Sequence, residues 1–273
     1  MLFFVLKFKY ICGSSLNMNT EISAKVKQIA KFHKDYEEEF LKDRIKNKKL
    51  YLSSPKDALF FIFSYSFYQG RIDELSHQFE ERARNTVNLF LENNDILSIS
   101  ASRITDKDVL KNRYKSLYNK LEENGVNKEG DRLMVLSLIN FIQSNNQKNI
   151  VKFIIEKIES NAISEAYKKL DEIYSIGPKV VSFILRDIVY IYELEKNLNK
   201  NDYYFLQPID TWVHKVSKMI GLINKDKSYK DEAKDITNRC FEFGVNPIHY
   251  NQGAWYIGTH SLEILLRNIK LLE

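Results

Sequence analysis

Cysteine is nearly absent from this 273-residue chain, which contains only Cys12 and Cys240. Two cysteines cannot form a disulfide framework, a cysteine-based zinc site or a four-cysteine iron–sulfur cluster. This scarcity excludes a small disulfide-stapled secreted scaffold and suits a reducing cytoplasm.

Glycine and proline are also scarce, with nine and four residues, which favours an all-α protein. Each of the four prolines stands where a helix can begin: Pro55, Pro178, Pro208 and Pro247. Apolar residues at spacings of three and four predict the helices that follow. We expect helices near residues 58–68, 75–90, 106–123, 131–144, 148–158, 162–173, 179–190, 212–220, 228–243, 247–257 and 260–271, and a loop at 196–201.

Long apolar runs are missing as well. The opening segment is briefly apolar, but Lys7 and Lys9 interrupt it, so neither a signal peptide nor a membrane span is expected. Met18 opens an ordinary helix-prone stretch, and residues 1–17 are therefore interpreted as a doubtful extension. The net charge of +5 is compatible with a polyanionic partner without demonstrating one.

A tight turn is predicted at Ser175-Ile176-Gly177-Pro178, between two helices. Gly177 permits a positive φ, and the helix that follows exposes backbone N–H groups able to hold a phosphate. Such a turn grips DNA backbone without reading sequence. A purely structural turn between two packed helices is the alternative interpretation.

Two short segments carry a resemblance to a known family. Ile176-Gly177-Pro178-Lys179 and Pro208-Ile209-Asp210-Thr211 resemble the hairpin end and the aspartate segment of the helix-hairpin-helix DNA glycosylases, the superfamily containing endonuclease III and the 8-oxoguanine glycosylases. The 31 positions from Lys179 to Asp210 are similar to the spacing in archaeal-type 8-oxoguanine glycosylases. Ser175 replaces the first glycine of the family's hairpin, and Pro178 stands where a polar or basic residue is usual.

The resemblance implies an all-α, two-lobed fold with a DNA-binding cleft between the lobes. One lobe would combine residues 18–65 with residues 196–273, and the other, residues 66–195, would end in the helix-hairpin-helix motif. The implied partner is double-stranded DNA that contains a damaged base. The expected protein is a monomer without membrane association, metal, iron–sulfur cluster or other cofactor, in the cytoplasm and, in a prokaryote, associated with the nucleoid.

The same resemblance implies that Lys179 is the attacking amine and Asp210 its carboxylate partner. The positive end of the helix macrodipole and partial burial both disfavour the ammonium form of a lysine in a first helical turn. A fixed carboxylate stabilises the positive charge that develops on the sugar as the base departs. The alternatives are a phosphate contact for Lys179 and an ordinary helix N-cap for Asp210.

Further contacts follow from the same alignment of motifs. Gln69 would enter the duplex as a wedge where the damaged nucleotide turns out. The other expected DNA contacts are Arg71, Ser175, Gly177, His214 and Lys215, and the expected base pocket consists of Phe67, Gln252 and Trp255. Core packing is the alternative role for Phe67 and Trp255.

The expected function is a bifunctional DNA glycosylase and abasic-site lyase that excises an oxidised base, 8-oxoguanine. Three alternatives remain open: a monofunctional glycosylase for alkylated bases, an enzyme for oxidised pyrimidines or abasic sites, and a helix-hairpin-helix module that binds DNA without catalysis.

Overall fold

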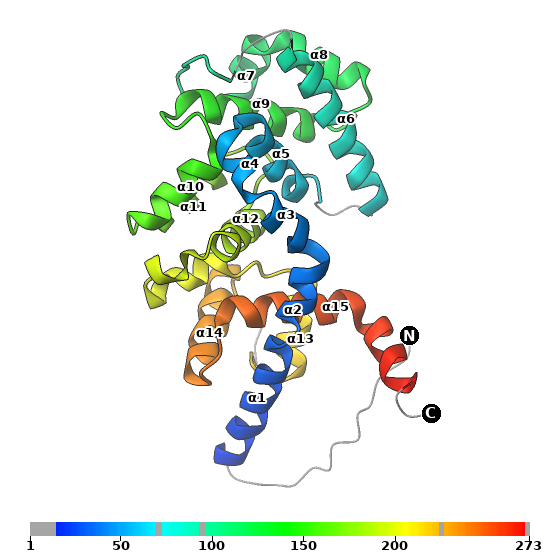
Figure 1. The fold of residues 1–273 in the computed structure, drawn as a ribbon, viewed down its shortest axis with the longest axis vertical. Coiled ribbons are helices and arrows are strands. Elements are labelled where there is room, and N and C mark those ends of the chain that lie inside the picture. The colour runs from blue at the N-terminus through cyan, green and yellow to red at the C-terminus, as the bar shows by residue number, and fades with distance from the viewer. Residues whose placement is uncertain (1–14, 69–72, 93–96, 224–226, 271–273) are drawn as a thin grey trace.

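The fold was analysed in a computed structural model that describes residues 15–68, 73–92, 97–223 and 227–270. Every regular element in these ranges is helical, which confirms the all-α prediction (Figure 1). The α-helices are α1 (Ser15–Ala30), α2 (His33–Tyr36), α3 (Lys42–Lys46), α4 (Lys48–Ser53), α5 (Pro55–Ser66), α6 (Asp73–Glu92), α7 (Lys107–Arg113), α8 (Lys115–Glu123), α9 (Glu129–Ser144), α10 (Ile150–Glu159), α11 (Ile163–Asp171), α12 (Pro178–Ile191), α13 (Thr211–Met219), α14 (Tyr229–Glu242) and α15 (Pro247–Lys270). A π-helical turn, η1 (Glu37–Leu41), and two 3-10 helices, η2 (Leu194–Asn197) and η3 (Lys200–Leu206), complete the set.

Prolines begin three of these helices, as predicted. Pro55, Pro178 and Pro247 are the first residues of α5, α12 and α15, where the missing N–H costs no hydrogen bond. Ser54 caps α5 by accepting a hydrogen bond from the Asp57 backbone N–H at 3.1 Å. Pro208 instead lies in the extended segment before α13.

The loop expected at residues 196–201 is a wrong prediction, because η2 and η3 occupy most of it. Asn199 and Asp202 form a reciprocal capping box at the start of η3. Local hydrogen bonding by these polar side chains therefore organises a stretch whose composition indicated only a loop. Elsewhere, Tyr114 divides the single helix expected at 106–123 into α7 and α8.

Two hydrophobic clusters form the interior of the described residues. The larger surrounds α12, whose Val181, Ile184 and Ile188 are fully buried, as expected for a helix through the middle of the protein. The smaller joins α1 to α13, α14 and α15, with Val26 and Val213 fully buried in it. Figure 1 shows α6 to α9 at one end of the molecule, α1, α13 and α14 towards the other, and α12 between them.

None of the described helices is both long enough and apolar enough to cross a membrane.

Candidate active site

The start of α12 and the start of α13 open onto the same cavity. Its volume is about 360 Å³, within the range of small-molecule sites. Lys179, in the first turn of α12, and Asp210, the residue before α13, both line it. The remaining lining residues are Tyr36, Phe40, Arg44, Ser64, Tyr65, Tyr68, Val180, Phe183 and Trp255. An amine and a carboxylate that are remote in sequence therefore share one largely aromatic pocket.

Asp210 is held rigidly by the helix that it caps. Its Oδ1 accepts hydrogen bonds from the backbone N–H groups of Trp212, at 2.9 Å, and Val213, at 2.8 Å. Burial raises the pKa of the Asp210 carboxyl, although the two backbone hydrogen bonds and the charge of Lys179 oppose the rise. The N-cap interpretation is thus correct, and it fixes the carboxylate at the edge of the cavity.

Lys179 is half-buried, and its positive charge acts to lower the pKa of the Asp210 carboxyl. Among the described residues the two side chains form no ion pair, so each remains available to a ligand in the cavity.

The hairpin before α12 differs from its predicted geometry. Gly177 has φ −97° and ψ 176°, so it does not adopt the positive φ that a glycine permits. Pro178 follows it, and a residue before proline is confined to extended conformations. Ser175 takes the left-handed conformation instead, with φ 57°. Its hydroxyl donates a hydrogen bond to the carbonyl oxygen of Gly130 at 3.2 Å, which ties the turn to α9.

Tyr229, at the start of α14, connects the two segments that present Lys179 and Asp210. Its hydroxyl lies 2.9 Å from the carbonyl oxygen of Gln207 and 3.3 Å from that of Pro178, and accepts a hydrogen bond from the Ile209 N–H at 3.4 Å. Sequence reasoning missed this residue, because a tyrosine after a capping serine carries no signal of its distant partners.

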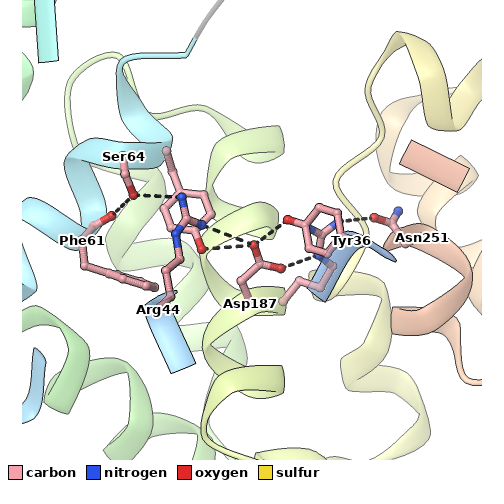
Figure 2. Close-up of polar contacts among 8 residues, drawn as sticks. Tyr36, Arg44, Phe61, Ser64, Asp187 and Asn251 are labelled. Atoms are coloured by element: carbon pink, nitrogen blue, oxygen red, sulfur yellow. Dashed lines mark hydrogen bonds and ion pairs between the residues drawn. The ribbon is translucent and has the colours of Figure 1, made fainter. Parts of the chain in front are cut away.

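A buried ionic network forms a second connection between α12, which carries Lys179, and the segment before Asp210 (Figure 2). Asp187 accepts hydrogen bonds from Tyr36 at 2.8 Å, Tyr65 at 3.1 Å and the Nε of Arg186 at 2.8 Å. Both Arg186 and Asp187 are completely buried. A charged pair inside the otherwise apolar helix α12 was the available sequence signal for this network.

The network reaches the segment before Asp210 through α15. The Nη1 of Arg186 donates to the Asn251 side chain at 2.7 Å, and the Asn251 amide donates to the carbonyl oxygen of Pro208 at 3.3 Å. Two successive hydrogen bonds therefore link helix α12 to the backbone next to Asp210. The first, from Arg186, is charge-assisted, and the second, from Asn251, is between neutral groups.

The expected base-pocket residues separate in the structure. Trp255 lines the cavity, with its ring edge-on to those of Tyr36 and Phe40. Phe67 is fully buried against Phe63 and does not line the cavity, because α5 directs it into the core. Gln252 is also fully buried and away from the lining, and its amide has no hydrogen-bond partner within the described part of the chain. Of the three expected base-pocket residues, only Trp255 therefore lines the cavity in this arrangement.

The expected DNA contacts also differ from one another. His214 is half-buried, and its Nδ1 lies 3.0 Å from both carboxylate oxygens of Glu232, so its partner is within the protein. Lys215 is exposed on α13, with its Nζ 5.2 Å from the centre of the Trp212 ring. Gln69 and Arg71 lie outside the described residues.

Within the described residues, no cluster of three or more histidine, cysteine, aspartate or glutamate side chains is able to hold a metal ion. A scan against protein-family models found no match to the chain, and neither did searches of the curated proteins and of the solved structures.

Proposed function

We propose that the chain is a helix-hairpin-helix DNA glycosylase with abasic-site lyase activity, and that 8-oxoguanine in duplex DNA is its substrate. The proposal rests on one observation. Lys179 and Asp210 line the same ligand-sized cavity, and among the described residues the two side chains form no ion pair with each other. The resemblance of their two sequence segments to the glycosylase motifs supplies the reaction class.

The proposed reaction uses each group once. The neutral Nζ of Lys179 attacks C1′ of the everted nucleotide, and the bond from C1′ to the base breaks as the base leaves with a proton. Asp210 stabilises the positive charge that develops on the sugar. Opening of the sugar ring gives a Schiff base between Nζ and C1′, loss of a C2′ proton breaks the bond from C3′ to oxygen, and water then releases the lysine.

The DNA-binding arrangement is part of the proposal. The two lobes would be residues 66–195 and residues 18–65 with 196–273, with Lys179 presented by the first and Asp210, at the start of α13, by the second. The left-handed Ser175 supports the hairpin assignment, because it supplies the backbone conformation for which the family uses glycine. Duplex DNA would bind as the partner of a monomer, in the nucleoid of a prokaryotic cytoplasm.

A second function is favoured by the cavity walls. Tyr36, Phe40, Phe183 and Trp255 give it an aromatic lining, and aromatic faces attract cations. This composition suits a monofunctional glycosylase that removes cationic, alkylated bases with Asp210 and water. Such an enzyme would not need the amine of Lys179.

Borohydride trapping distinguishes these functions. Wild-type protein and Lys179→Gln are incubated with duplexes containing 8-oxoguanine, thymine glycol, uracil, 7-methylguanine or an abasic site. Lys168→Gln, an exposed lysine of α11, is the control. We expect trapping with wild type and Lys168→Gln and none with Lys179→Gln. Continued trapping in Lys179→Gln refutes the amine assignment, and undiminished base release without trapping favours the alkylated-base function. Tight DNA binding with no product in any variant identifies a non-catalytic module.

A further inference from the structure

Arg44 brings a positive charge to the wall of the cavity. This residue lies in α3, and its side chain is 21% exposed. The guanidinium carbon sits 4.2 Å from the centre of the Tyr65 ring, and Nη2 donates a hydrogen bond to the Ser64 hydroxyl at 3.2 Å. These contacts hold the guanidinium plane in one orientation, while most of its five N–H donors form no hydrogen bond to the residues that the structure describes. Arg44 is thus a fixed donor at the edge of the pocket.

The charge of Arg44 is only partly balanced. Its nearest carboxylate is that of Asp187, 3.9 Å from Nη1, and the same carboxylate is bound more closely by Arg186, at 2.8 Å (Figure 2). Two guanidinium groups share one carboxylate, which leaves a positive charge on this wall of the cavity, while the carboxylate of Asp210 lines the same cavity at the start of α13. Burial raises the pKa of the Tyr36 and Tyr65 hydroxyls, so neither becomes an anion that offsets it. At low effective dielectric this charge acts strongly on the part of a ligand that lies against Arg44.

We propose that Arg44 is a specificity-determining residue that donates hydrogen bonds to a carbonyl oxygen of the everted base and rejects cationic, N-alkylated bases. The inference rests on the proposed glycosylase function and narrows its substrate class to uncharged bases that carry an exocyclic carbonyl. A guanidinium has donors and no acceptor, so it binds carbonyl oxygens and cannot serve the amino groups of adenine-like bases. The aromatic walls alone would accept a cation, and the charge of Arg44 opposes that preference.

The same donors are able to hold a phosphate oxygen of the everted nucleotide. A phosphate contact is the same for every lesion, whereas a base contact depends on which base enters. If Arg44 binds a phosphate, replacing it should slow excision of every lesion equally. If it binds the base, the loss in excision rate should differ from one lesion to another.

Single-turnover excision from duplexes containing 8-oxoguanine or 7-methylguanine tests the proposal. The 7-methylguanine nucleotide retains the O6 carbonyl and carries a positive charge. We compare wild type with Arg44→Met, which removes the charge and the donors, and with Arg44→Lys, which retains the charge without the planar donor array. Arg82→Met is the matched control, because Arg82 lies on α6, outside the cavity, and its guanidinium likewise donates a hydrogen bond within the protein, to the carbonyl oxygen of Gly125.

Wild type is expected to prefer 8-oxoguanine, and Arg44→Met to lower the ratio of 8-oxoguanine to 7-methylguanine excision at least tenfold. Arg44→Lys should slow 8-oxoguanine excision while still rejecting 7-methylguanine, and Arg82→Met should leave the ratio unchanged. An equal loss on both duplexes in Arg44→Met overturns base recognition in favour of a phosphate contact. Equal excision of both lesions by wild type overturns the charge argument.

Nucleoside binding gives a readout that does not require catalysis. In a Trp212→Phe background, Trp255 is the remaining tryptophan of the two in the chain and lies in the cavity wall. Quenching of its fluorescence by inosine, a neutral carbonyl nucleoside, is expected at lower concentration than quenching by the cationic 1-methyladenosine, and Arg44→Met should abolish the difference. This preference without any excision would mean that the glycosylase proposal fails while the pocket specificity holds. Excision without the preference would mean that the Arg44 inference fails while the enzyme proposal holds.

Discussion

The hydroxyl of Tyr229 lies 3.3 Å from the carbonyl oxygen of Pro178, the residue that precedes Lys179. The same hydroxyl is bound to backbone groups of Gln207 and Ile209, just before Asp210. One side chain thus holds both segments that present the proposed reacting groups, although 51 positions separate it from Pro178.

Tyr229→Phe tests whether this bridge sets the geometry of the site. We expect single-turnover excision to slow about tenfold, or about 1.4 kcal/mol, with little change in DNA affinity. The acid limb of the pH profile should move to higher pH, because Asp210 loses part of the attraction to Lys179 that lowers its pKa. Tyr204→Phe is the control, since the Tyr204 hydroxyl forms no hydrogen bond among the described residues. An unchanged pH profile would contradict the positioning role.

Asp210→Asn should lower the rate of excision and, at neutral pH, raise the stability of the fold. Excision is expected to fall about 100-fold or more, the usual cost of removing an electrostatic stabiliser. The folded-state pKa of Asp210 is raised mainly by burial, so its ionisation costs stability as pH rises through that pKa. Because asparagine caps equally well and carries no charge, Tm at neutral pH should rise, and the gain should vanish below the pKa of the unfolded carboxyl.

The matched control for this substitution is Asp106→Asn. Asp106 caps α7 with two backbone hydrogen bonds, both at 2.9 Å, and lies outside the cavity. The Asp106→Asn substitution should leave the rate of excision unchanged. Loss of activity in Asp106→Asn, or a lower Tm in Asp210→Asn at neutral pH, is inconsistent with this account.

His249 should make the protein sensitive to mild acid. Its ring stacks on that of His33, with centroids 3.9 Å apart, and burial followed by the charge of His33 lowers its pKa to about 4, against the weaker opposite effect of Glu37. The unfolded chain therefore binds a proton that the folded chain excludes. Stability is complete above the unfolded pKa of about 6.5 and is lost as pH falls towards about 4.

Urea denaturation from pH 7 to pH 4 measures this loss. His249→Gln should flatten the profile between pH 6.5 and pH 4, because glutamine does not titrate. His77→Gln, an exposed histidine of α6, should leave the profile as in wild type. If both variants follow the wild-type curve, another group governs the acid sensitivity.

Substitution of Ser175 should lower the stability of the protein, whereas substitution of Gly177 should leave it unchanged. Gly177→Ala is expected to retain full stability, because φ is −97° and, apart from the chain neighbours, no atom of the described residues lies within 4 Å of an added Cβ. Ser175→Val should destabilise the protein by about 1–2 kcal/mol, since a β-branched residue is poorly suited to the left-handed conformation. Thermal unfolding of the two variants checks both. A large loss of stability in Gly177→Ala would contradict the extended conformation of Gly177. If stable Gly177→Ala binds DNA weakly, the loss is due to close backbone approach.

Apolar periodicity and proline position were sufficient to predict most of the helices, because both act within a few residues. The buried helix α12 and the cap at Asp210 followed from the pattern near each residue. The same local rules failed at 196–201, where the capping box of Asn199 and Asp202 competes with a loop.

The amino-acid sequence by itself determined the helical class, the starts of α12 and α13, and the amine and carboxylate that stand there. Only the tertiary structure decided that these groups share a cavity, that Phe67 belongs to the core, and that Arg44 and Tyr229 belong beside the site. The reason is physical: helix formation depends on neighbours three and four positions away. A cavity, by contrast, is made by side chains brought together from α2, α3, α5, α12 and α15 through packing and buried hydrogen bonds, which no local pattern encodes.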